Sequence, residues 1–318
     1  MAKFRSRARI VIGGVLAAGA LLAGIGLMSL RRKPSLTVAF GAEFLTRPDG
    51  YEGLSRHYGF RFESEPRQMM DGLMYKALSV GSVDVIDAFT TDGRILAYDL
   101  VILEDDRRFF PPYHAAPLIR GESLALHPEL KTVLNTLAGR ITDADMRRMN
   151  HEVDEEGKTA HAVARAFLDE QGLLGSREAA GKAGAAPIVV GSKEFTEQEI
   201  LGEMLALLIE SHTDIPVTRK LNLGGTIICF NALQAGDLDV YPEYTGTGLV
   251  NILKRDTVSD PDAVYEIVRQ AFCDQYGLIW LKPFGFNNSY ALAMRKDHAR
   301  RLGIRTISDL ARYVKRSP

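Results

Sequence analysis

The stretch ALSVGSVDV at residues 77–85 returns as ALQAGDLDV at residues 232–240, an offset of 155 residues. Each copy is followed four residues later by an aromatic residue and a threonine, Phe89-Thr90 in the first and Tyr244-Thr245 in the second. A duplicated sequence of this length predicts two structurally related halves.

A second pair lies upstream of the first. VAFGAEF at residues 38–44 matches VVGSKEF at 189–195, with an offset of 151 residues, and LVIL at 100–103 has a counterpart in LIWL at 278–281. The alternative is that α/β units resemble one another by composition, but the shared order and near-constant spacing favour duplication. Two related halves predict two lobes, with a cleft between them where a ligand is held.

Short apolar runs alternate with helical stretches along the chain, which predicts an α/β fold with parallel sheets. The expected strands cover residues 36–40, 83–86, 100–103, 188–190, 238–241 and 278–281. The clearest helix opens at Thr196, and Glu199 three residues later predicts a capping box there.

Composition excludes several classes of protein. The chain has 318 residues, of which 46% are hydrophobic and 25% charged, as in an ordinary globular protein long enough for two domains. The formal net charge of −1 leaves no excess of positive charge that would attract nucleic acid. The two cysteines, Cys229 and Cys273, are too few for a disulfide scaffold, although an oxidising compartment would permit one bridge.

The N-terminus carries an uncharged, mostly apolar run at residues 10–30, with basic residues on both sides. A bilayer span needs about 20 such residues, whereas the apolar region of a cleaved signal is shorter. Residues 1–33 are therefore expected to contain a transmembrane helix at about 10–30, with a cleaved export signal as the alternative. Either reading places the body of the protein outside the cytoplasm.

The search for catalytic motifs returns little. The sequence has no phosphate-binding loop, no nucleophile elbow and no pair of histidines in zinc-protease spacing. The residues indicate no enzyme, no metal and no cofactor.

Aromatic residues stand where predicted strands end. Tyr244, Tyr290, Tyr113 and Phe89 occupy such positions, and open α/β sheets present ligand-contacting groups at these ends. Each ring taken alone is more often a packing residue. Together, rings from two lobes can enclose a cation through their π-faces, while the apolar surroundings suit methyl groups. This chemistry binds a quaternary ammonium group.

The sequence resembles the substrate-binding proteins of ABC transporters for glycine betaine, choline and related osmoprotectants. The motifs that carry the resemblance are GSKEFTEQ at 191–198, LNLGGT at 221–226, YPEYTGT at 241–247, GFNN at 285–288, EFLTRPDG at 43–50, TDGR at 91–94 and FFPPYHAAP at 109–117. The resemblance implies a two-lobed periplasmic-binding-protein-like (type II) fold that closes on its ligand.

The order of these motifs differs from the family's order, because here the second half comes first. This implies a circular permutation, with GLLGSREAAGKAGAAP at 172–187 as a flexible tether that joins the family's usual ends. Carried over to this order, lobe A covers residues 94–289 and lobe B combines 34–93 with 290–318. A rival reading is a fragment of a longer fused transporter.

The resemblance also implies a ligand site. Its aromatic cage falls on Tyr244, Tyr290, Tyr113 and, where tyrosine is frequent, Phe89. The carboxylate of a betaine would be bound by Arg47 and Lys193, with Thr247 and Gln198 as neutral donors. Arginine offers a bidentate and more directional contact than lysine.

These features predict a membrane-tethered protein that captures glycine betaine, choline or a similar solute and delivers it to the permease and ATPase subunits of an ABC transporter. A sensing or scaffolding domain with the same fold is the alternative from another class. An incomplete fragment is a third, and the two halves could also close between two copies of the chain.

Overall fold

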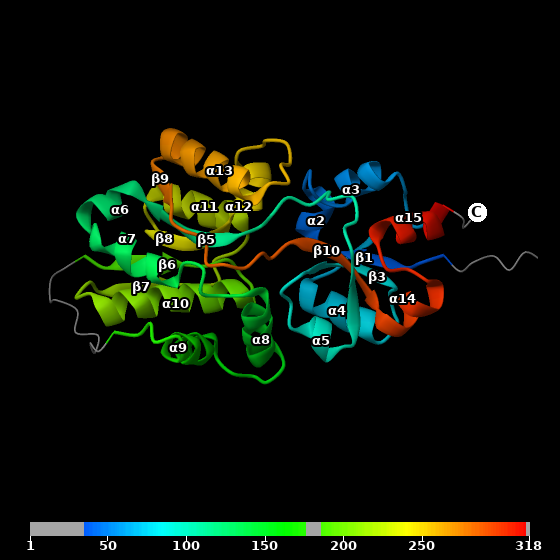
Figure 1. Ribbon diagram of the computed structural model, residues 1–318, viewed down its shortest axis with the longest axis horizontal. Helices are drawn as coiled ribbons and strands as arrows, with labels where there is room; N and C mark the ends of the chain where they lie inside the picture. The colour runs from blue at the N-terminus through cyan, green and yellow to red at the C-terminus, as the bar shows by residue number, and fades with distance from the viewer. Residues whose placement is uncertain (1–34, 176–185, 316–318) are drawn as a thin grey trace, which may run out of the picture.

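The computed structural model describes residues 35–175 and 186–315, which form two α/β lobes along the long axis of the molecule (Figure 1). Each lobe is built on one five-stranded sheet with helices packed on its faces. The predicted α/β class and the two lobes are confirmed. The predicted parallel sheets are only partly correct, because each sheet contains one antiparallel strand, β10 (Tyr290–Arg295) or β5 (Ala115–Arg120).

Lobe B contains the sheet with strand order β2-β1-β3-β10-β4. β1 is parallel to β2 and β3, whereas β10 runs antiparallel to β3 and β4. Its strands are β1 (Val38–Phe40), β2 (Arg67–Gln68), β3 (Val85–Phe89), β4 (Leu100–Leu103) and β10 (Tyr290–Arg295). Its helices are α2 (Ala42–Thr46), α3 (Tyr51–Tyr58), α4 (Asp71–Ser79), α5 (Arg94–Ala97), α14 (Lys296–Leu302) and α15 (Ile307–Lys315).

Lobe A contains the sheet with strand order β7-β6-β8-β5-β9. Its strands are β5 (Ala115–Arg120), β6 (Ile188–Gly191), β7 (Val217–Lys220), β8 (Val240–Tyr244) and β9 (Leu278–Trp280). Its helices are α6 (Gly121–Leu126), α7 (Glu129–Leu134), η1 (Asn135–Leu137), α8 (Asp143–Asp154), α9 (Ala160–Glu170), α10 (Thr196–His212), α11 (Thr226–Ala235), α12 (Thr245–Thr247), η2 (Gly248–Ile252) and α13 (Pro261–Tyr276).

The two sheets have the same arrangement of parallel and antiparallel strands, so the two copies of the sequence repeat form corresponding parts of the two lobes. In each sheet the fourth strand is antiparallel and comes from the other half of the chain: β10 joins lobe B and β5 joins lobe A. The two crossing segments meet in an antiparallel bridge between His114 and Asn287. Each half therefore completes the lobe of the other.

One predicted lobe boundary is wrong. Residues 94–103 were assigned to lobe A, but β4 pairs with β10 along Leu100–Leu103 in the sheet of lobe B. The chain crosses between the lobes after this strand, because Glu104 still forms a bridge with Thr306 of lobe B. Local apolar patterning shows that a strand exists at 100–103 but does not show which sheet it joins.

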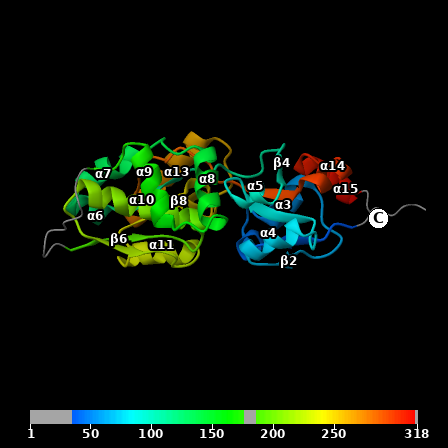
Figure 2. The same ribbon diagram turned by 90° about the horizontal axis from the view of Figure 1, so that it is seen from below.

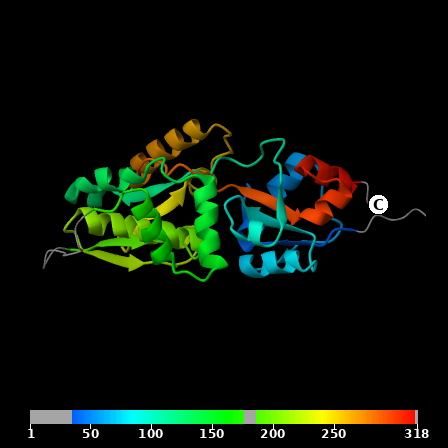
Figure 3. The ribbon, with the colours of Figure 1, turned by 60° about the horizontal axis from the view of Figure 1, so that its bottom comes forward.

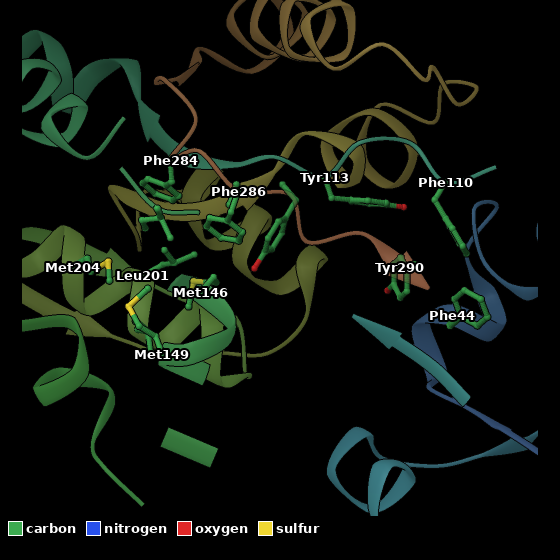
Figure 4. Close-up of a cluster of buried hydrophobic side chains, with 14 of the residues drawn as sticks. Phe44, Phe110, Tyr113, Met146, Met149, Leu201, Met204, Phe284, Phe286 and Tyr290 are labelled. Atoms are coloured by element: carbon green, nitrogen blue, oxygen red, sulfur yellow. The ribbon is translucent and has the colours of Figure 1, made fainter. Parts of the chain in front are cut away.

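An apolar cluster continues from one lobe into the other (Figure 4). It runs from Phe284 and Phe286 in lobe A, past Tyr113 and Tyr290, to Phe44 in lobe B. The helix α10 lies at its centre in lobe A, and twelve of its residues are buried. This burial explains why α10 is apolar around most of its circumference.

Helix ends follow recognisable local signals, with one correction. α13 begins with Asp260 as its N-cap and Pro261 at its first turn, and ends at Gly277 in the left-handed conformation (φ 66°). The predicted capping box at Thr196 is wrong, since Phe195 is the N-cap of α10 and has no side chain that caps the helix. Thr196 instead donates its hydroxyl to Asp154.

Two predicted features lie wholly or partly in residues that the structure does not describe. The expected transmembrane helix at about 10–30 and residues 176–185 of the tether lie outside the described residues. Within 35–175 and 186–315, no helix is both long and apolar enough to cross a bilayer. In the same ranges both cysteines are free, with Cys229 buried and Cys273 exposed.

Candidate functional site

A cavity of about 690 Å³ lies between the two lobes. Residues that follow β1 and β3 line it from lobe B, and residues that follow β6 and β8 line it from lobe A. This position at the carboxyl ends of parallel strands is the one that the sequence predicts. A volume of this size falls in the range of small-molecule sites, about 300–1,000 Å³.

All four predicted cage rings line this cavity. The Phe89 and Tyr290 ring centroids lie 4.9 Å apart, on neighbouring residues of the β3–β10 pair. The Tyr113 and Tyr290 centroids are 5.7 Å apart, with the rings nearly perpendicular. Tyr244 forms the wall on the lobe A side, at the end of β8.

Two further rings line the cavity, one from each lobe, and sequence reasoning missed both. Phe195 stacks between Phe89 and Tyr244, with centroid distances of 6.2 and 6.3 Å. Phe44 packs on Tyr290 at 5.3 Å. These two residues occupy the same position in the repeated segments 38–44 and 189–195, so the repeat itself carried the signal that could have found them.

Arg47 lines the cavity from the end of α2, but a buried carboxylate already holds it. Its guanidinium donates twice to Asp49, Nε to Oδ1 and Nη2 to Oδ2, each at 2.8 Å. Tyr113 also donates its hydroxyl to Asp49. Burial alone would lower the pKa of Arg47, but Tyr290, Tyr113 and Asp49 outweigh it and raise the pKa well above its ordinary value.

Lys193 has a similar arrangement in lobe A. Its ammonium group forms an ion pair with buried Glu243 at 2.6 Å and lies 5.0 Å from the centre of the Tyr244 ring. The guanidinium carbon of Arg47 lies 5.2 Å from the centre of the Tyr290 ring. Each predicted carboxylate partner therefore sits beside a cage ring and beside its own counter-ion.

Of the two predicted neutral hydrogen-bond donors, Thr247 and Gln198, only Thr247 lines the cavity. Gln198 is fully buried outside the lining residues, and its Oε1 accepts the backbone N–H of Lys193 at 3.3 Å. Gln198 can therefore support the loop that carries Lys193 rather than contact a molecule in the cavity.

Glu197 forms hydrogen bonds with residues from several segments around the cavity. Its carboxylate accepts hydrogen bonds from Thr91 of lobe B and from Asn150, Tyr244 and Asn288. Burial raises the pKa of Glu197, and the four hydrogen bonds act in the opposite direction. Asn150 lies on α8, which stands at the boundary between the lobes (Figure 3). Glu197 therefore fixes the Tyr244 ring and ties lobe B to lobe A.

Steric constraints require a glycine at position 246, in the segment 241–247. A Cβ atom on Gly246 would lie 2.7 Å from the Tyr113 ring and 2.8 Å from the Pro112 carbonyl oxygen. Such distances do not occur for real Cβ atoms, so only glycine lets Tyr113 pack here. By contrast, the neighbouring Tyr241 is buried and donates to Glu243, which makes it a structural residue.

The charges around the cavity are mixed. Six acidic and three basic side chains line it: Glu43, Asp87, Asp92, Asp154, Glu194, Glu197, Arg47, Arg94 and Lys193. Burial raises the pKa values of Tyr113, Tyr244 and Tyr290, so these phenols stay neutral near pH 7 and keep their donor hydrogens. The site thus combines neutral π-faces with the cations Arg47 and Lys193 beside them, which suits a small ligand that carries both an onium group and an anionic group.

Comparison with known proteins fits this arrangement. Residues 28–170 and 186–318 match the family described as the substrate binding domain of ABC-type glycine betaine transport systems. The chain belongs to this family. The two matched segments lie on either side of the predicted tether, and together they include both lobes.

Two relatives illustrate the similarity to members of the family. The carnitine transport binding protein OpuCC of Listeria monocytogenes is 43% identical over 123 residues, which is 38% of this chain and 39% of that protein. The glycine-betaine-binding protein of Pseudomonas aeruginosa is 40% identical over 142 residues, 44% of this chain and 46% of that protein.

A third relative joins two functions in one chain. It is the ergothioneine transport permease/ergothioneine binding protein EgtU of Helicobacter pylori, 44% identical over 126 residues, which is 39% of this chain and 22% of that protein. Among solved structures, a glycine betaine/carnitine/choline ABC transporter is 41% identical, with 43% of this chain and 50% of that chain covered and a TM-score of 0.36. The chain spans about two fifths of the length of the first curated relatives that it matches.

Proposed function

We propose that this chain is an extracytoplasmic solute-binding protein that captures a quaternary ammonium compatible solute, such as glycine betaine or choline, for uptake through an ABC transporter. The observation that carries the proposal is the ring-lined cavity between the lobes, in a chain that belongs to the glycine betaine family. In this proposal the ligand is held by π-faces and paired cations, and no chemical step is assigned to the carboxylates that also line the cavity.

In this proposal Tyr244, Tyr290, Tyr113 and Phe89 surround the ammonium group. Phe89 and Tyr113 pack against Tyr290, and Tyr244 stacks on Phe195. The methyl groups of the ligand would contact the apolar ring faces, and its positive charge would be attracted by their π-electrons. The absence of a hydroxyl on Phe89 keeps its π-face but removes one hydrogen-bonding group from this wall.

A ligand carboxylate would bind to Arg47 and Lys193, with Thr247 as a neutral donor and Gln198 holding the Lys193 loop. Both cations have carboxylate partners, so the ligand would share them with Asp49 and Glu243. Sharing costs little when the cation has spare donors, and both arginine and lysine have more donors than these ion pairs use.

The partners follow from the proposed role. The permease and ATPase subunits of an ABC transporter would receive the solute, and the apolar segment at about 10–30 would tie the body to the outer face of the membrane. The circular permutation stays a prediction: the usual family ends would be joined through the segment 172–187. The exchange of β5 and β10 is compatible with it, since the lobes can be completed in either chain order.

The proposal is tested by thermal unfolding of the full chain in detergent with glycine betaine, choline, carnitine and proline. A ligand at one hundred times its Kd adds about 2.7 kcal/mol to the free energy of unfolding, which raises Tm by several degrees. We expect such a rise for at least one quaternary ammonium ligand and none for proline. A protein whose Tm responds to none of the quaternary compounds is not a binding protein of this class.

A further inference from the structure

Most of the exposed large apolar side chains in the described part of the chain lie in, or directly beside, two segments that line the cavity. Two of them form the lobe B lip, Met70 and Leu73, which are 80% and 59% exposed. Three form the lobe A lip, Leu223, Ile227 and Ile228, which are 37%, 48% and 55% exposed. Only three more residues of this kind are exposed in the same ranges. Such a concentration marks a surface that something covers.

Both lips border the same cavity. Met69, Met70 and Gly72 line it at the start of α4, and residues 224–226 line it at the start of α11. In Figure 2 the two helices lie along the same lower edge of the molecule, one in each lobe.

The sequence repeat makes the lips equivalent. The offset of 155 residues that relates 77–85 to 232–240 also relates the first residue of α4 to the first residue of α11, and it relates Leu73 to Ile228. Because the two sheets share one plan, equivalent positions of the two lobes face the cleft in the same way. Leu73 and Ile228 are therefore counterparts in the two lobes, each in the first turn of a helix whose start lines the cavity.

The lobes are already close beside these lips. A Cβ atom on Gly225, the N-cap of α11, would lie 3.0 Å from Oε1 of Glu43 on α2 of the other lobe. The start of α11 therefore lies next to lobe B at the edge of the cavity, and closure of the lobes is the movement that would bring it toward α4.

We propose that Leu73 and Met70 pack against Ile227 and Ile228 when the lobes close, so that the lips form an apolar contact between the lobes that stabilises the closed state. The inference rests on the proposed function, since ligand binding is what would drive closure. The occupant of each lip is the other lip of the same chain. Apolar surface buried only in the closed state shifts the equilibrium toward that state, and it raises affinity without touching the ligand.

A double-mutant cycle on the full chain tests this contact, with glycine betaine as the probe and Kd as the readout. Leu73→Lys and Ile228→Glu should each weaken binding by about tenfold, because each puts a charge into the closed contact. The double variant should recover a substantial part of this loss, because the two new charges would meet. The control is Leu126→Lys, at the end of α6 and 78% exposed, which should leave Kd unchanged.

Ligand-free cross-linking tests the contact independently. With Cys273→Ser as background, the pair Leu73→Cys and Ile228→Cys should form a disulfide under mild oxidation faster than the pair Leu73→Cys and Leu126→Cys. Native Cys229 can remain, because burial raises the pKa of its thiol to about 12. Peptide mass spectrometry identifies which cysteines are joined.

The outcomes separate the two claims. If no quaternary ammonium ligand binds but the 73–228 pair cross-links preferentially, the proposed function fails and the lip contact stands. Single variants with the wild-type Kd, or effects that simply add, overturn the lip contact. A fall in solute uptake with Kd unchanged also overturns it, since the lips would then dock on a transporter subunit instead.

Discussion

At the scale of single residues, the site depends on aromatic rings that each contact a small number of other side chains. Phe89 contributes only a ring face, since its backbone N–H is bonded to the Tyr75 hydroxyl and its side chain has no polar atom. It stacks on Phe195 and packs against Tyr290. A substitution here therefore tests the π-face without disturbing a hydrogen bond.

Phe89→Leu should weaken binding of glycine betaine by roughly 0.5–2 kcal/mol, a factor of about 2 to 30 in Kd, because it removes one π-face from around the ammonium group. Titration calorimetry measures the change. Phe109→Leu is the matched control, since that ring packs on His57 and Phe110 outside the cavity lining. Equal Kd values for the Phe89 and Phe109 variants would remove Phe89 from the cage.

Asp49→Asn should lower the free energy of unfolding by about 3–5 kcal/mol, because it removes the buried counter-ion of Arg47 and leaves only half-exposed Glu43, 3.8 Å away. Urea unfolding followed by circular dichroism measures this loss. The double variant Arg47→Gln with Asp49→Asn should be more stable than Asp49→Asn alone, since no uncompensated charge remains. If Asp49→Asn unfolds at the same urea concentration as the wild type, the ion pair has no structural role.

The two cysteines should react very differently with iodoacetamide at pH 7.5. Burial raises the pKa of the Cys229 thiol to about 12, so almost no reactive thiolate is present, and the side chain is also covered by protein. Cys273 is exposed and should be alkylated first. Mass spectrometry of the native protein should find one modified cysteine, and alkylation of Cys229 at a similar rate would contradict its buried position.

At the scale of elements, helix α8 has the capping box that the sequence led us to expect at α10. Thr142 accepts the Asp145 backbone N–H, and the Asp145 side chain accepts the Thr142 backbone N–H. Thr142→Ala should therefore lower the free energy of unfolding by about 1 kcal/mol, within a range of about 0.5–2. Thr142→Ser keeps the hydroxyl and should unfold like the wild type in the same urea titration. No difference between the two variants would show that the box adds nothing.

The elements show how far sequence reasoning reaches. The strands at 36–40, 83–86, 100–103, 188–190, 238–241 and 278–281 all exist within a few residues, because buried strands need short apolar runs. The start of α10 was predicted at the correct residue, but its cap was not, because the same Thr and Glu spacing occurs without the hydrogen bonds. The partner strand of β4 could not be predicted, since pairing depends on the long-range crossing of β10.

The same distinction applies to the site. The predicted residues Tyr244, Tyr290, Tyr113, Phe89, Arg47, Lys193 and Thr247 all line one cavity. Phe89 and Tyr244 end β3 and β8 as expected, whereas Tyr290 begins β10 and Tyr113 precedes β5, because these two segments run in the opposite direction. Asp49 and Glu197 were missed as partners, because a carboxylate that serves a buried cation or ring looks like any other acidic residue in sequence. Their roles depend on contacts between segments 47 to 106 residues apart, or on local geometry that only the fold reveals.

At the scale of the whole molecule, duplication explains both the fold and the cavity. Each half builds most of one sheet and gives one strand to the other sheet, and the ring-bearing ends of β3 and β8 come from equivalent positions of the two halves. One site per chain follows, because the equivalent ends converge on a single cavity.

Titration calorimetry of the full chain with glycine betaine tests this account most directly. We predict a single binding event with one ligand per chain, which Tyr244→Ala weakens, since that change removes the lobe A ring. No heat of binding with glycine betaine, choline or carnitine, or a stoichiometry of one ligand per two chains, would contradict a site built between the two lobes of one molecule.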